Sequence, residues 1–206
     1  MAVALATLVG CATNDTAREA PKPKDGIAEY REIVREALAA IATALSSLDR
    51  VRAQTDRCSP RIVRAFSKEV QTLQAESIKV RARNQAMQAR GDAYFAHWEE
   101  NLARVKDPRV RELAQRHHLQ LLQSFARIKQ TSQQTGDAFR PFLSGLRKLQ
   151  LTLENDSGCL GTDATRELVR STRQKGRQVQ AGLVAIRQEL DAMTGLLTPV
   201  KPAAQH

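Results

Sequence analysis

Apolar side chains recur at alternating steps of three and four residues through four long stretches of this chain, and this spacing limits the folds open to it. Residues spaced in this way lie along one stripe of an α-helix. The first stretch has the most regular stripe: Ile27, Tyr30, Val34, Ala37, Ile41, Ala44, Leu48 and Val51. Four such helices have to bury their stripes against one another, as in helical bundles and coiled coils.

Three breaks separate the stretches. Ser59-Pro60 and Asp107-Pro108 each pair an N-cap residue with proline at the first helical position, and Thr162 caps the last helix. Asp25 is the predicted cap of the first. The sequence thus predicts one domain over residues 25–198, with helices at about 26–56, 60–105, 108–154 and 163–197. Because Pro141 lacks a backbone N–H, we expect a kink there or a restart after residues 136–137.

Helix length decides the architecture. The two middle helices should each span ~70 Å, whereas the outer two reach only ~45 to 55 Å. Since short connections favour antiparallel neighbours, the middle hairpin should overhang the others. We therefore predict an all-α fold, an elongated antiparallel up-down four-helix bundle resembling a coiled coil, with an overhanging central hairpin.

An apolar or small run opens the chain and ends in Leu8-Val9-Gly10-Cys11. It resembles the signal of bacterial lipoproteins, although no Lys or Arg precedes the run, so we expect the start to lie upstream of Met1. The resemblance implies that residues 1–10 are a signal peptide, that Cys11 is lipidated, and that Ala12 favours the periplasmic face of the outer membrane over the inner membrane. An apolar tail on a cytoplasmic protein is the alternative.

Residues 11–24 start at Cys11, which the resemblance implies is lipidated, and they carry no apolar periodicity, so they predict a flexible tether of about 20 Å. Residues 199–206 predict a disordered tail. Cys58 and Cys159 fall in turns that an up-down bundle places at one end. In an oxidising periplasm we expect them to form a disulfide, stabilising by up to ~4.7 kcal/mol in the chain-entropy estimate; two unrelated thiols are the alternative.

Aromatic and imidazole side chains gather near the expected hairpin tip: Tyr94, Phe95, His97, Trp98, His117 and His118. Core packing accounts for this group best, because Tyr94 and Trp98 fall on the stripe. A partner-contact surface is the alternative. No carboxylate stands three residues before a histidine, as dinuclear bundle sites require, so we expect no metal.

Four arginines follow one another on the last helix at steps of four, three and four: Arg166, Arg170, Arg173 and Arg177. Glu167 is the one acid among them, so pairing within the helix cannot neutralise the stripe. Phosphates or carboxylates could bind there; a solvated face, or one paired with Glu of the first helix, is the alternative.

Small or polar residues interrupt the stripes midway along the bundle: Ala37, Ala40, Ser77, Asn84, Ser132, Thr135, Gly136, Ala181 and Gly182. Several of them should share one layer. We interpret this layer as close helix approach with a buried polar group that fixes register. A small hydrophilic cavity is the alternative.

Catalytic signatures are absent from the sequence, which has no glycine-rich phosphate loop, nucleophile elbow, His-Glu-x-x-His or Cys-x-x-Cys. We expect no enzymatic activity and no cofactor. The net charge of +10 favours polyanionic partners without identifying one.

Three motifs, at residues 94–100, 107–111 and 139–147, resemble an uncharacterised family of bacterial envelope proteins expected to be helical bundles. The resemblance implies the fold and no mechanism. The leading interpretation is a lipid-anchored spacer, scaffold or adaptor that contacts an envelope protein or an anionic surface, with homo-oligomers left open. The alternatives are a membrane-surface module binding anionic lipid through the arginine stripe, and a cytoplasmic binder of polyanions or nucleic acid, although nucleic acid is not the expected partner.

Overall fold

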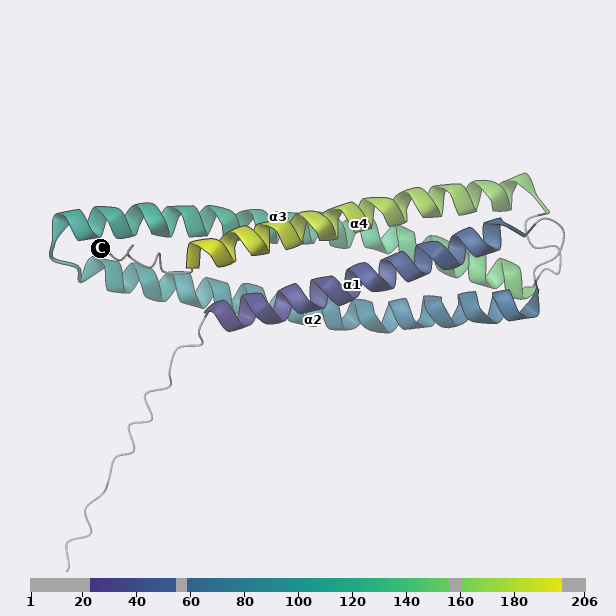
Figure 1. The fold of residues 1–206 in the computed structure, drawn as a ribbon, viewed down its shortest axis with the longest axis horizontal. Helices are drawn as coiled ribbons and strands as arrows, with labels where there is room; N and C mark the ends of the chain where they lie inside the picture. The colour runs from purple at the N-terminus through teal and green to yellow at the C-terminus, as the bar shows by residue number, and fades with distance from the viewer. Residues whose placement is uncertain (1–22, 55–58, 156–160, 198–206) are drawn as a thin grey trace, which may run out of the picture.

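Four long helices make up the computed structural model over the residues that it describes, 23–54, 59–155 and 161–197 (Figure 1). They are α1 (Pro23–Arg52), α2 (Pro60–Ala103), α3 (Pro108–Asn155) and α4 (Asp163–Leu197). Each helix runs antiparallel to the next, and the described residues contain no strand. The predicted all-α, up-down four-helix bundle is confirmed.

The helices form a ring in which each touches its two neighbours. α1 packs on α2 and α4, and α3 packs on the same two helices. The described helices make no close backbone contact across the two diagonals of the ring. Their stripes therefore meet along one central line.

The predicted stripes form the core. All eight stripe residues of α1 are buried, and Leu121, Ile128, Leu146, Leu149, Ile186 and Leu190 from α3 and α4 are essentially inaccessible to solvent. The stripe of α2 is less regular, because Phe95, which lies beside the expected stripe position Tyr94, is the more buried of the two. Periodicity thus located three stripes well, and the favoured core packing of the aromatic group holds for Phe95, although Phe95 lies off the expected stripe.

Three of the predicted caps are present. Ser59 Oγ accepts a hydrogen bond from the N–H of Arg61 at 3.3 Å. Asp107 Oδ1 accepts from Arg109 N at 2.8 Å, and Thr162 Oγ1 accepts from Thr165 N at 3.2 Å. These side chains satisfy N–H groups that the first helical turn leaves without a carbonyl partner.

One local expectation was wrong, and of the two alternatives at Pro141, a kink or a restart, the restart is excluded. α1 begins at Pro23, so Asp25 lies inside the helix and does not cap it. α3 does not restart after residues 136–137 but continues through Pro141 as one helix. Pro141 is exposed. The carbonyl of Asp137 that it leaves unpaired therefore faces water, which lowers the cost of keeping proline inside the helix.

The middle hairpin overhangs the other helices, as predicted. Near its start, α1 lies beside Arg90: Glu29 Oε2 is 3.1 Å from a guanidinium nitrogen of that residue. α2 then continues to Ala103, about 20 Å farther at 1.5 Å per residue. α4 ends where the carbonyl of Leu196 meets His117 Nε2 at 2.9 Å. Beyond these points only α2 and α3 remain paired (Figure 1).

A cavity of about 140 Å³ lies midway along the bundle. Its lining includes seven of the nine small or polar residues singled out from the sequence: Ala37, Ala40, Ser77, Asn84, Ser132, Thr135 and Gly136. Tyr30 Oη lies 3.2 Å from Ser132 Oγ, a buried hydrogen bond across the ring. The layer thus contains a buried polar contact, as expected, and a cavity that is mainly apolar where the alternative had been a hydrophilic one.

Several predictions concern residues outside the described part of the chain. These are the signal at residues 1–10, the lipidated Cys11, most of the tether, the Cys58–Cys159 disulfide and the tail. The described helix ends that flank Cys58 and Cys159 lie at one end of the bundle (Figure 1). None of the described helices is long and apolar enough to cross a membrane.

Candidate functional site

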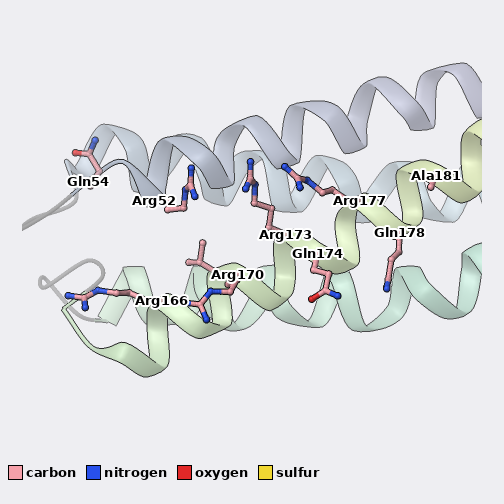
Figure 2. A pocket seen from close by; sticks show the side chains of 10 residues that line it. Arg52, Gln54, Arg166, Arg170, Arg173, Gln174, Arg177, Gln178 and Ala181 are labelled. Atoms are coloured by element: carbon pink, nitrogen blue, oxygen red, sulfur yellow. The ribbon is translucent and has the colours of Figure 1, made fainter.

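An open groove of about 870 Å³ lies where the end of α1 meets the start of α4. Its lining contains no acidic residue, and five arginines dominate it: Arg52, Arg166, Arg170, Arg173 and Arg177. We call this the arginine groove. Arg52, Arg173 and Arg177 place their guanidinium groups in a row between the two helices (Figure 2).

Helix geometry explains why four of these side chains share one opening. Steps of four, three and four keep residues on one face of a helix, and Val169, on the buried side of that face, packs into the core with 1% exposure. Val169 fixes the rotation of α4, so the predicted arginine stripe flanks the seam toward α1. The sequence missed Arg52, because only the tertiary packing of α1 on α4 brings it there.

Three acids at the edge of the groove pair with four of its arginines. Arg166 and Arg170 each bind an acid three residues earlier, Asp163 at 2.9 Å and Glu167 at 2.6 Å. Asp163 was not among the expected partners, so pairing within α4 neutralises more of the stripe than we expected. All four side chains are largely exposed, and such surface pairs contribute little stability.

Arg173 is bound differently, since its partner comes from another helix. Its Nε lies 2.9 Å from Asp49 Oδ1 on α1, and Arg52 Nε lies 3.9 Å from the same oxygen. The expected partner from the first helix was Glu, and the structure places Asp49 there instead. This pair is the most buried in the groove, and it links α1 to α4.

Arg177 has no acidic partner among the described residues and is exposed in the groove. Counting the pairs above, five arginines meet three acids, so the groove keeps an excess of two positive charges. A guanidinium presents a fixed fork of donors that fits carboxylates and phosphates in two-point contact. The groove can therefore bind an anionic group.

The residues predicted at the hairpin tip separate into two sets. Tyr94, Phe95, Trp98, His117 and His118 come together, and we call them the ring cluster. Ring centroids are 5.3 Å apart for Trp98 and His118, 5.6 Å for Phe95 and His118, and 5.5 Å for Tyr94 and Trp98. His97 points away and lies 3.8 Å from the exposed Glu100.

Packing accounts for most of the ring cluster. Phe95 is 4% exposed and His118 6% exposed. Their rings meet edge to face, an arrangement that stabilises a pair of rings. Burial also raises the pKa of the half-buried Tyr94. Within the described part of the chain, no group of three or more His, Cys, Asp or Glu side chains is arranged to hold a metal ion.

Comparison with known families assigns the chain. Residues 24–192 match the family described as Protein of unknown function (DUF2959). No curated protein and no solved structure matches it. Because the match covers most of the sequence, the chain belongs to this uncharacterised family.

Proposed function

We propose that this DUF2959 protein is a non-enzymatic, lipid-anchored protein of the bacterial envelope, attached through Cys11 to the periplasmic face of the outer membrane. The sequence Leu8-Val9-Gly10-Cys11 carries this proposal, because it resembles the end of a lipoprotein signal. Two or more acyl chains give stable attachment where one does not. The bundle then acts as a rigid spacer that holds a binding surface away from the lipid.

The arginine groove is that surface. It lies at the far end of α1, a helix of 30 residues, so about 45 Å of helix separates it from the tether. The described helix ends that flank Cys58 and Cys159 lie at the same end (Figure 1). A disulfide between these cysteines would link those helix ends. The partner we propose is an envelope protein with exposed carboxylates.

Fractionation tests the anchor. Cys11→Ala should move the protein from the membrane to the soluble fraction, and radiolabelled palmitate should enter the unaltered chain but not the variant. Cys58→Ser is the matched control, since it removes a cysteine and should leave both results unchanged. Membrane retention of Cys11→Ala would contradict the anchor. Alkylation without reduction, followed by mass spectrometry, tests the disulfide separately.

Crosslinking in intact cells tests the groove. A photoreactive residue in place of Gln178, which lines the groove, should capture a partner protein. The same residue at Gln71, an exposed position on α2, should not. Adding Arg177→Gln should reduce capture, whereas Arg187→Gln, ten residues along the same helix, should not. Equal capture at Gln178 and Gln71 would argue against a binding surface at the groove.

A second function, a membrane-surface module, is favoured by one observation, the unpaired Arg177 beside four further arginines. Anionic vesicles would then bind Cys11→Ala protein and release it at high salt, because screening weakens contacts between exposed charges. A spacer whose groove binds a protein predicts no sedimentation that depends on Arg177. Vesicle sedimentation of Cys11→Ala with and without Arg177→Gln, at low and high salt, separates the two functions.

A further inference from the structure

The overhanging hairpin and the start of α1 lie at the same end of the molecule (Figure 1). Residues 11–22 precede α1, and a flexible chain of that length spans about 20 Å. Past Arg90, where α1 begins alongside it, α2 extends to Ala103, also about 20 Å. If Cys11 carries lipid, which is the proposed function on which this inference rests, the hairpin tip reaches the depth of the membrane surface.

The tip exposes apolar side chains that its own packing does not use. Val110 is 53% exposed and Leu113 is 65% exposed, one turn apart at the start of α3. Val105, in the turn itself, is half-buried. These side chains form an apolar face at the end of the rod.

Basic residues surround that face: Arg104, Lys106, Arg109 and Arg111. The two nearby acids are engaged elsewhere. Asp107 Oδ1 caps α3 by accepting from Arg109 N at 2.8 Å and Val110 N at 3.3 Å. Glu112 Oε1 lies 3.8 Å from Arg116 Nη2. The tip therefore presents a positive and apolar surface, a combination that suits anionic headgroups above acyl chains.

Hydrogen bonds hold the turn in one shape. Arg111 Nε donates to the carbonyl of Val105 at 2.9 Å, and the N–H of Arg104 donates to Asn101 O at 3.0 Å. The ring cluster supports the same two helices from behind. A membrane contact would thus lose little conformational entropy in the turn.

We propose that residues 102–113, the hairpin foot, contact anionic phospholipid in the membrane that holds Cys11. Val110 and Leu113 enter the interface, and the four basic residues meet phosphate groups. The molecule then stands on two points, the acyl chains and the foot, and directs the arginine groove away from the bilayer. A protein tethered through residues 11–22 alone would have no fixed direction.

Tryptophan fluorescence tests the foot, because Trp98 is the only tryptophan in the chain. In a Trp98→Phe background, Val110→Trp places a reporter on the foot, and Leu151→Trp places a matched reporter on the same helix. These sites are 53% and 58% exposed and about 60 Å apart. The lipidated full-length proteins are reconstituted in vesicles of phosphatidylglycerol and phosphatidylcholine with brominated acyl chains. The foot tryptophan should shift to the blue and lose most of its emission, and the Leu151→Trp reporter should keep its own.

Flotation of the same samples distinguishes the outcomes. If both proteins float and neither tryptophan is quenched, the proposed membrane contact of the hairpin foot is wrong, whereas the lipid anchor at Cys11 is supported. If both tryptophans are quenched equally, the rod lies flat on the lipid, which overturns the foot in favour of the membrane-surface module. If neither protein floats, both proposals fail. Replacing phosphatidylglycerol by phosphatidylcholine alone should weaken quenching at the foot, and unchanged quenching would remove the role assigned to the basic residues.

Discussion

The two ends of this rod meet the same packing problem with different numbers of helices. At the hairpin end α1 is absent, and α2, α3 and the last turns of α4 bury a core rich in rings: Tyr94, Phe95, Trp98 and Phe125, with His118 among them. At the groove end four helices surround mainly aliphatic side chains. Aromatic residues bury more area each. Three helices can therefore close a core with few of them.

This difference separates residues needed for the fold from residues free for function. The ring cluster looks like a binding site in a chain with 4% aromatic residues, yet the packing of a segment that α1 does not cover accounts for it. Apart from Arg173, which links α4 to Asp49 of α1, the arginines of the groove have no such explanation, since Val169 and its neighbours already close the core beneath them. Nor does packing explain Val110 and Leu113. The surfaces that folding does not require are the ones we assign to partners.

The largest expected effect compares two buried phenylalanines of α2. Phe66 lies in the four-helix part and is 1% exposed. Phe66→Ala should lower the free energy of unfolding by about 3–5 kcal/mol. Phe95→Ala should instead open the hairpin locally, because α1 does not cover that segment. Urea denaturation should thus respond mainly to Phe66→Ala, and hydrogen exchange in residues 92–103 to Phe95→Ala. Equal shifts of the urea midpoint, with no local exchange, would show that the hairpin is not a separate unit.

The second comparison uses two glycines. A Cβ on Gly91 would lie 2.2 Å from the ring of Phe125, at the base of the overhang, so Gly91→Ala should destabilise by about 1–3 kcal/mol. Gly136 has no atom within 4 Å of that position, and Gly136→Ala should stabilise the helix by up to ~1 kcal/mol. Thermal unfolding of the two variants measures both. The same sign for both would mean that Phe125 can move aside.

Sequence periodicity predicted the ring of four helices and nearly all of its stripe residues. Apolar residues at alternating steps of three and four over a long stretch fit only an α-helix with one buried face. The periodicity predicted the overhang too, since that follows from helix lengths alone. Phe95 was expected to pack in the core with its group, but it lies one position off the regular stripe, where a segment that α1 does not cover can rotate. Such a rotation of α2 depends on the absence of α1 beside it, and the local sequence of α2 does not indicate that absence.

The candidate site divides in the same way. The arginine stripe of α4 could be read from its spacing, whereas Arg52 and Asp49 joined it only through packing of α1 against α4. An up-down topology already places the end of the first helix beside the start of the last. The topology therefore indicated that these two helix ends are neighbours. The sequence did not indicate how α1 is rotated about its axis, and this rotation points Arg52 and Asp49 toward α4.

The third comparison lies within the groove. Arg173→Ala should destabilise by about 1 kcal/mol, because it leaves the half-buried Asp49 without its closest partner. Arg177→Ala removes an exposed side chain with no acidic partner among the described residues, so its effect on stability should stay within about 0.5 kcal/mol. Denaturation curves give the first number, and capture at Gln178 should fall for Arg177→Ala. A stability loss as large for Arg177→Ala would assign it to the fold.

The smallest effect compares the two tyrosines and appears only in alkali. Burial raises the pKa of Tyr30, opposed in part by its hydrogen bond with Ser132, and burial raises the pKa of Tyr94 as well. A raised folded-state pKa means that the folded protein holds the proton more tightly. The resulting stability is fully present below the unfolded value of about 10 and is lost as pH rises through the folded pKa. Tyr30→Phe should flatten this loss, measured as the unfolding free energy from pH 9 to 11. Tyr94→Phe should flatten it less, because Tyr94 is half-exposed at the end of the bundle that α1 does not cover. If Tyr94→Phe had the larger effect, Tyr94 would have to be more buried than Tyr30, and a further part of the chain or a second protein would have to cover it.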